Sequence, residues 1–295
     1  RIGTGVNTIP VDKLTQMGVA VFNCPGGNAN AVKELAICGM ILSCRKIVDG
    51  INWVKEQKDN GNNNISVNME NAKKAFVGRE IYGKKLGLIG VGAVGSLVAN
   101  SAIDLGLKVY GYDPYLSVDA ALRLSPQIKM VKDRDEIFKN CDFISVHLPL
   151  TDNTRDIINK DNLKLFKNDC VLMNFARGVL VNTDALLEAL DNQKLGRYVT
   201  DFPNYKTANM DGVVAISHLG ASTEEAEDNC AAMAAKQVVD YVENGNIINS
   251  VNYPRIDLGP KAGTRVVVLF EGDHIAEVTG LLKATKSKIP KKTKN

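Results

Sequence analysis

The sequence predicts an α/β protein built on a doubly wound parallel sheet, with a second, smaller domain. Between Leu86 and Ser217, short apolar runs alternate with amphipathic stretches, which is the pattern of strand–helix–strand units. The runs are almost continuously apolar, as expected of strands that helices cover on both faces. At 295 residues the chain also exceeds one average domain. The predicted strands are 86–89, 108–112, 143–148, 171–175, 198–200 and 213–216.

Two long helices flank this region. Apolar residues recur at helical spacing over 29–47, and a second helix is predicted to start at the capping sequence Ser222-Thr223-Glu224-Glu225 and to end at Asn244-Gly245. Residues 58–74 are polar and lack a strong period, so they are predicted to form a surface loop.

A glycine fingerprint follows the first predicted strand. Gly90, Gly92 and Gly95 lie between that strand and a helix starting near Ala93 and Val94. In this context the glycines allow a tight turn, close approach of a pyrophosphate and close helix packing, so a Rossmann-type dinucleotide site is expected.

Asp113 ends the next predicted strand, 18 residues after Gly95. A carboxylate there can accept hydrogen bonds from a ribose 2′-hydroxyl and would repel a 2′-phosphate, which favours NAD over NADP. The alternative is that Asp113-Pro114 is a plain turn initiator.

Downstream of the fingerprint stand an arginine and a histidine suited to hydride transfer. Arg177 lies in Asn174-Phe175-Ala176-Arg177-Gly178, and His218 in Ser217-His218-Leu219-Gly220. A guanidinium can hold a carboxylate with two hydrogen bonds, and an imidazole can take or give a hydroxyl proton. The order of motifs therefore indicates an oxidoreductase for a 2-hydroxy acid. Arg177 as a structural ion-pair partner is the alternative.

Composition excludes several other classes. Six of the 36 Lys and Arg residues lie in 283–295, and the remainder of the chain has 30 basic and 33 acidic residues, so no nucleic-acid surface is expected. No apolar run approaches the ~18 residues of a membrane span. Six scattered cysteines without a C-x-x-C pair indicate reduced thiols in a cytoplasmic protein. No metal site is predicted.

Taken together, these motifs resemble the D-isomer-specific 2-hydroxyacid dehydrogenases from Arg1 to about Tyr253. The resemblance rests on Pro25-Gly26-Gly27-Asn28, Gly111-Tyr112-Asp113-Pro114-Tyr115, His147-Leu148-Pro149-Leu150-Thr151, Ala176-Arg177-Gly178, Thr200-Asp201-Phe202-Pro203-Asn204 and His218-Leu219-Gly220-Ala221-Ser222-Thr223.

The resemblance implies a role for each matching position. Arg177 would bind the substrate carboxylate, His218 would be the acid and base, and Asp201 would hold the nicotinamide carboxamide. Arg1 and Asn7 are weaker candidates for substrate contact, and His147 is expected to be a packing residue at a strand end. The residues expected to line the cofactor are Gly90, Gly92, Ala93, Val94, Gly95, Asp113, His147, Leu148, Pro149, Phe175, Ala176, Arg177, Asp201, His218, Gly220 and Ala221.

The resemblance also divides the chain. Residues 1–27 would be the remnant of a flavodoxin-like substrate domain whose first fifty or so residues would precede Arg1, and 28–228 would be the NAD-binding domain. Residues 229–253 would return to the substrate domain. Residues 254–295 would form a truncated ACT-like segment, with a strand at 265–270 and a helix at 273–282, followed by the basic tail.

One family feature is absent. Relatives pair the catalytic histidine with a glutamate four or five residues beyond the aspartate that matches Asp201, where this chain has Tyr205 and Lys206. That glutamate orients the imidazole and stabilises its charged form, so slow turnover is expected here.

The resemblance implies oxidation of 3-phospho-D-glycerate to 3-phosphohydroxypyruvate by a homodimer. Two alternatives stay open: a glyoxylate or hydroxypyruvate reductase of the same family, and a non-catalytic NAD-binding dimer.

Overall fold

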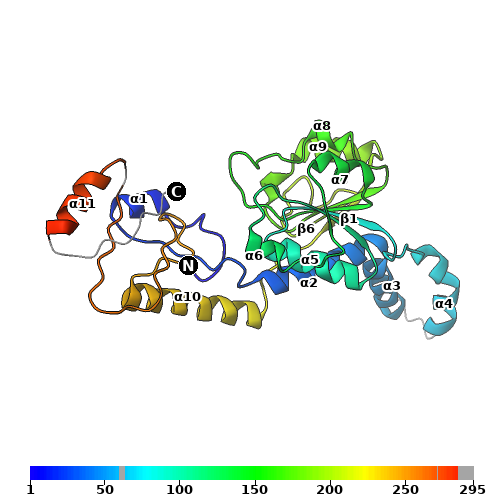
Figure 1. Cartoon of the computed structure of the whole chain (residues 1–295). Coiled ribbons are helices and arrows are strands. Elements are labelled where there is room, and N and C mark those ends of the chain that lie inside the picture. Colours follow the sequence, from blue (N-terminus) through cyan, green and yellow to red (C-terminus); the bar gives the residue numbers. More distant parts are fainter. Residues whose placement is uncertain (60–63, 271, 285–295) are drawn as a thin grey trace. The chain divides into compact units, whose positions relative to one another are not determined.

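The computed structural model describes residues 1–59, 64–270 and 272–284, which fall into two compact units (Figure 1). The larger unit is Asn28–Ala226, and the smaller combines Arg1–Gly27 with Glu227–Asn295. The second junction falls in the first turn of α10 (Glu224–Asn244). No helix among the described residues is long and apolar enough to cross a membrane.

The larger unit is built on a seven-stranded sheet in which every neighbouring pair is parallel, in the order β3-β2-β1-β4-β5-β6-β7. This confirms the predicted doubly wound, Rossmann-type sheet. The order reverses between β1 and β4, so the loops that follow these two strands open a crevice at the carboxyl edge of the sheet. The strands are β1 (Lys85–Ile89), β2 (Lys108–Tyr112), β3 (Lys129–Met130), β4 (Phe143–Val146), β5 (Cys170–Asn174), β6 (Leu195–Thr200) and β7 (Val213–Ala215).

Helices cover both faces of this sheet (Figure 1). On one face, α2 (Ala29–Cys44) and α5 (Ala93–Asp104) bury Ala36, Met40 and Val98 against it. On the other, α7 (Arg134–Asn140), α8 (Lys160–Leu163) and α9 (Thr183–Asp191) bury a second cluster that includes Phe138 and Leu186. Two apolar layers therefore cover the central strands, which explains why β1, β4 and β5 are buried almost throughout.

The prediction of a surface loop over 58–74 is wrong for the described residues of that range. After α3 (Ile47–Asp59) the chain forms α4 (Ile65–Ala72) and a 3-10 turn at Lys73–Phe76, while 60–63 lie outside the described residues. No residue of α4 is buried, and a helix that buries no face need not show an apolar period. The strand β3 was also not predicted, because both of its residues are exposed. The short α6 (Val118–Ala121) is capped by Ser117.

The smaller unit contains α1 (Val11–Gln16), most of α10 and α11 (Ile275–Ala284). Isolated bridges join Phe22 to Ser250 and Ile247 to Ile256. The strand predicted at 265–270 does not form: these residues pair with no strand, and the Arg265 Nη1 donates to the carbonyl oxygens of Asn244 and Gly259 at 2.6 and 3.1 Å. An extended segment becomes a strand only where a neighbour offers a ladder, and none of the described residues does so here.

Candidate functional site

The loop after β1 forms a cradle that requires glycine. Gly90 has φ +93°, and a Cβ on it would lie 2.7 Å from the carbonyl oxygen of His147. A Cβ on Gly95 would lie 2.2 Å from the carbonyl oxygen of Gly90, whereas one on Gly92 would meet nothing within 4 Å. Gly92 caps α5 without a side-chain hydrogen bond, so the first N–H groups of the helix remain free for an anion. Ala93 is exposed and Val94 half-buried beside them.

Asp113 reaches back to this cradle from the end of β2. One carboxylate oxygen accepts the N–H of Val91 at 3.0 Å, and the other accepts the N–H of Tyr115 at 3.0 Å. The side chain is thus both a turn former and a neighbour of the glycine loop. A carboxylate has about four acceptor positions, so Asp113 retains capacity for ribose hydroxyls.

His147 follows β4 on the other side of the crevice. Its Nε2 lies 2.9 Å from Ser145 Oγ, and its backbone N–H donates to the carbonyl of Ile89 at 2.8 Å. Burial lowers the pKa of His147 to about 4, so the ring is neutral at neutral pH. Beyond it, the Leu148 side chain is half-buried against Gly90, and Pro149 is exposed.

His147 makes stability depend on pH. Its folded-state pKa, about 4, lies below the ordinary 6.5, so the unfolded chain binds the proton more tightly between these values. Stability should fall as the pH drops from 6.5 to 4, by about 3 kcal/mol at most, because part of the side chain is exposed. In His147→Asn, urea unfolding should show a smaller difference between neutral and acidic buffer than in the unmodified chain; equal differences would contradict the assignment.

The loop after β5 is held by the buried Asn174. Its Oδ1 accepts the N–H groups of Ala176 and Arg177 at 3.1 and 3.3 Å, and its Nδ2 donates to the carbonyl of Arg177 at 2.8 Å. Phe175 is buried in the core beneath. The Arg177 guanidinium, which also donates to the Ala176 carbonyl, lies 5.8 Å from the Phe202 ring centre. One amide side chain therefore fixes the backbone that carries the arginine.

Phe202 packs against His218 as well as lying near Arg177. Its ring centre is 4.4 Å from that of His218, so Arg177 and His218 contact a single ring. The adjoining Asp201, which directly follows β6, is 1% exposed. Its Oδ2 accepts the N–H of Gly220 at 3.1 Å. A Cβ on Gly220 would lie 2.9 Å from that oxygen, while Ala221 next to it is half-buried.

The second carboxylate oxygen of Asp201 accepts no hydrogen bond from the described residues. This oxygen, Oδ1, is buried. Burial raises the pKa of Asp201 above its ordinary value, and the Gly220 N–H, His218 and Arg177 oppose that rise. A buried acceptor without a donor is costly, so this oxygen suits a ligand N–H such as that of a carboxamide.

Tyr205 and Lys206, which stand where relatives are expected to have a glutamate, form no hydrogen bond with His218 among the described residues. Tyr205 is 98% exposed, and Lys206 Nζ forms an ion pair with Asp184 Oδ1 at 2.6 Å. Asn204 Oδ1 fixes this turn by accepting the N–H groups of Lys206 and Thr207, each at 3.0 Å. Within the described part of the chain, His218 has no hydrogen-bond partner. The Lys206 charge is thus already neutralised by Asp184.

The two weaker candidates belong to the smaller unit. Arg1 Nη1 donates to the carbonyl of Ile2 at 2.8 Å and its Nε to that of Gly5 at 3.3 Å, while Asn7 is exposed. The sequence reasoning missed Asn174, Phe202 and Asn204 as residues that shape the site. A polar residue ending an apolar run was the available signal for Asn174.

Comparison with known proteins identifies the family. The sequence profile described as "D-isomer specific 2-hydroxyacid dehydrogenase, NAD binding domain" matches residues 37–220. The chain belongs to this family. It therefore contains the NAD-binding domain of an NAD-dependent 2-hydroxyacid dehydrogenase. The glycine cradle and the orphan oxygen of Asp201 fit such a cofactor.

Relatives within the family differ in substrate. D-3-phosphoglycerate dehydrogenase of Methanocaldococcus jannaschii is 33% identical over 287 residues, which is 94% of this chain and 52% of the relative. Hydroxypyruvate reductase of Thermotoga maritima is 38% identical over 237 residues, 77% of this chain and 71% of the relative. The chain thus spans about half the length of the phosphoglycerate dehydrogenases from M. jannaschii, Synechocystis and Bacillus subtilis that it matches.

Solved structures give the same fold. NAD⁺-bound 3-phosphoglycerate dehydrogenase of Entamoeba histolytica has a TM-score of 0.67 and 29% identity, covering 85% of this chain and 74% of that one. An acyclic imino acid reductase bound to NADPH and D-Arg has a TM-score of 0.70 and 27% identity, covering 85% and 76%.

Proposed function

We propose that this chain oxidises 3-phospho-D-glycerate to 3-phosphohydroxypyruvate with NAD⁺. The observation that carries the proposal is the Phe202 ring, which Arg177 and His218 both contact beside the free acceptor of Asp201. A carboxylate-binding cation, a proton acceptor and a carboxamide acceptor are the three groups that dehydrogenation of a 2-hydroxy acid needs.

The cofactor would lie along the carboxyl edge of the sheet. We assign the pyrophosphate to the free N–H groups at the start of α5, the ribose to Asp113 and the carboxamide to Asp201 Oδ1. When bound, the oxidised nicotinamide supplies the carbon that accepts the hydride.

Arg177 and His218 handle the substrate. The guanidinium holds the carboxylate in two parallel hydrogen bonds, which fixes the carbon that bears the hydroxyl. His218 removes the hydroxyl proton as the hydride leaves that carbon, so the alcohol loses two electrons and two hydrogens and becomes a ketone. The Phe202 ring limits how the imidazole can turn.

The phosphorylated substrate is favoured by its frequency among the named relatives. The phosphoglycerate dehydrogenases of M. jannaschii, Synechocystis, B. subtilis and Archaeoglobus fulgidus are 32–34% identical to this chain. The reductase of T. maritima supports hydroxypyruvate instead, with 38% identity over more of its own length.

A second candidate is an NAD-binding dimer with little or no catalysis. It is favoured by Tyr205 and by the Lys206–Asp184 ion pair at the positions where a carboxylate would orient His218. Cofactor contacts would survive this change, because they come from other residues.

Steady-state turnover and NADH binding, measured on one sample, separate these functions. We expect NADH to bind, and slow turnover to be faster with 3-phosphoglycerate than with glycerate. A preference for hydroxypyruvate reduction would identify the reductase, and tight NADH binding with no turnover of any 2-hydroxy acid would identify the non-catalytic protein.

NADH is expected to bind at least about tenfold more tightly than NADPH, because the Asp113 carboxylate would repel a 2′-phosphate. Fluorescence titration measures both dissociation constants. Asp113→Asn removes the charge and keeps an acceptor for one of the two backbone N–H groups, so it should narrow the ratio of the two dissociation constants, whereas Asp152→Asn should leave that ratio unchanged. Similar dissociation constants for NADH and NADPH in the unmodified chain would contradict the assignment of Asp113 to the ribose.

We infer that the protein is a homodimer through the larger unit. Large apolar side chains remain exposed on α3 and α4, and exposed apolar surface marks interaction sites: Ile47, Ile51, Val54, Val67 and Met69. Sedimentation at micromolar concentration should show the dimer mass. A monomer throughout that range would contradict the inference.

A further inference from the structure

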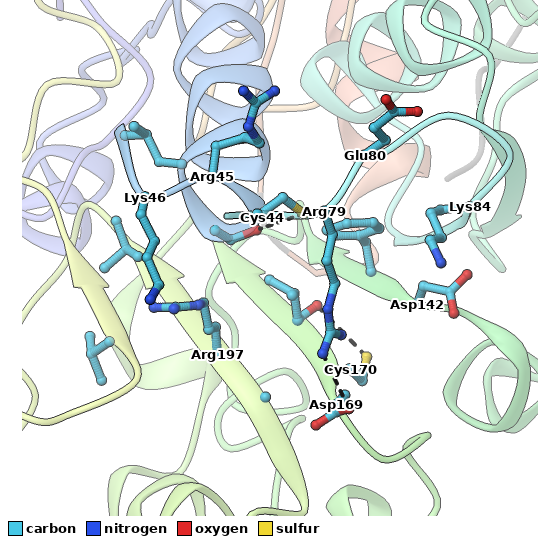
Figure 2. A pocket seen from close by; sticks show the side chains of 18 of the residues that line it. Cys44, Arg45, Lys46, Arg79, Glu80, Lys84, Asp142, Asp169, Cys170 and Arg197 are labelled. Carbon is cyan, nitrogen blue, oxygen red and sulfur yellow. Dashed lines mark hydrogen bonds and ion pairs between the residues drawn. The ribbon is translucent and has the colours of Figure 1, made fainter. Parts of the chain in front are cut away.

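The larger unit has a pocket at the edge of the sheet opposite the residues assigned to the dehydrogenase site. It encloses about 970 Å³ and is lined by the amino ends of β4 to β7, the end of α2 and the segment before β1 (Figure 2). The glycine loop, Arg177 and Asp201 all follow the carboxyl ends of the same strands. Because the strands are parallel, a molecule in this pocket would not compete for the cofactor crevice.

Cations predominate around this pocket. Its basic side chains are Arg45, Lys46, Arg79, Lys84, Lys167 and Arg197, against the acidic Asp49, Glu80, Asp142 and Asp169. Lys167 is already paired with Asp142, at 2.5 Å, while Arg79 approaches Asp169 only to 3.7 Å, with both side chains largely exposed. Most of the positive charge is therefore uncompensated by close contacts.

Arg197 is the most informative of these cations. It projects from β6, is half-buried, and has no hydrogen-bond or ion-pair partner within the described residues. A guanidinium carries five donors, and those of Arg197 are not buried away from the pocket, so they remain available to the acceptors of a ligand. Lys46 uses one of its three donors, on the carbonyl of Ala75 at 3.0 Å. Figure 2 shows Lys46, Arg79 and Arg197 extending into the pocket from three different segments.

Cys44 lies among these cations. Burial raises the pKa of Cys44 above its ordinary value, while the hydrogen bond with Ser43 and the charges of Arg79, Arg197 and Lys84 favour its thiolate. Positive potential from separate segments thus converges on one half-buried atom inside the pocket.

We propose that this pocket binds a small phosphate-type dianion, held by Arg79, Arg197 and Lys46. The two arginines supply planar pairs of N–H donors that match phosphate oxygens, and the lysine adds a compact charge. Such an anion would satisfy the donors of Arg197 and offset the repulsion among the three cations. The source is either free phosphate or the phosphate group of a small monoester, which share this chemistry.

Protection of Cys44 from alkylation tests the proposal at the pocket itself. Cys38 lies on the same helix, is exposed, and does not line the pocket, so it serves as an internal control. With saturating NADH to fill the glycine loop, inorganic phosphate at ten times its dissociation constant should slow iodoacetamide labelling of Cys44 about tenfold and leave Cys38 unchanged. Glycerol 2-phosphate in a parallel series tells whether a monoester also enters.

Matched variants complete the test. Arg197→Gln and Arg79→Gln should each lose the protection while NADH binding persists, whereas Arg123→Gln, an exposed arginine outside the pocket, should retain it. Arg79 is largely exposed, so its variant folds even if that of Arg197 does not. The proposal fails if sodium chloride at equal ionic strength slows Cys44 labelling as much as phosphate does, or if both variants keep the protection. It also fails if Cys44 labelling slows as the protein concentration rises in the absence of phosphate, because a second copy of the chain would then cover the pocket.

Discussion

Replacing His218 by alanine is expected to lower kcat by ~10²–10⁴-fold, the range that a positioned general base contributes. In the proposed mechanism the imidazole accepts the substrate proton beside Arg177, and within the described residues no other imidazole or carboxylate is found in contact with the Phe202 ring. NADH affinity should change little, because the pyrophosphate and ribose assignments involve other residues.

The matched control is His274→Ala, which removes an exposed histidine of the smaller unit that pairs with Glu277. Stopped-flow and steady-state kinetics on the three proteins give the comparison. If His218→Ala turns over as fast as the unmodified chain, another group removes the proton and the assignment of His218 is wrong.

Introducing a carboxylate at position 206 is expected to raise kcat by about 10–100-fold, the usual effect of a residue that orients a catalytic histidine. In the present turn a glutamate at 206 would face Asp184, the partner of Lys206. The variant is therefore Lys206→Glu combined with Asp184→Asn, so that the new carboxylate is not repelled from its neighbour and can turn toward His218.

Lys206→Gln with Asp184→Asn is the control, since it removes the same ion pair without adding an acid. Only the glutamate variant should gain activity, and NADH affinity should be equal in both. If the gain is absent while NADH binds tightly, the non-catalytic function is favoured. If the unmodified chain already matches ordinary relatives in rate, some other carboxylate reaches His218.

The sheet was predictable because its strand sequences are largely apolar, and because β1, β4 and β5 are buried almost throughout. Each strand from β1 to β7 apart from β3 left a nearly continuous apolar run, and the glycine spacing fixed where the crevice opens. The signal failed where an element buries nothing, as in α4, and where a run that resembles a strand has no neighbour to pair with, as at 265–270.

The site was only partly predictable for a similar reason. Arg177 and His218 could be singled out by chemistry, but their meeting on one ring depends on Phe202, whose role is visible only in three dimensions. Asp184, which forms an ion pair with Lys206, lies 22 residues earlier in the chain, on α9, whereas Lys206 lies in a turn. Sequence spacing alone could not pair them.

The discontinuity of the smaller unit sets an order of events during synthesis. Its closing contacts join residues more than 200 positions apart: the Cys24 thiol donates to the Cys230 carbonyl at 3.2 Å, and the Val21 N–H to Asn252 Oδ1 at 2.9 Å. During synthesis, residues 1–27 are made before the rest of their unit and cannot complete their contacts until 227 onward has emerged, while the continuous stretch Asn28–Ala226 can form its sheet in the meantime. Residues 1–27 therefore precede the larger unit in the chain but become native after it.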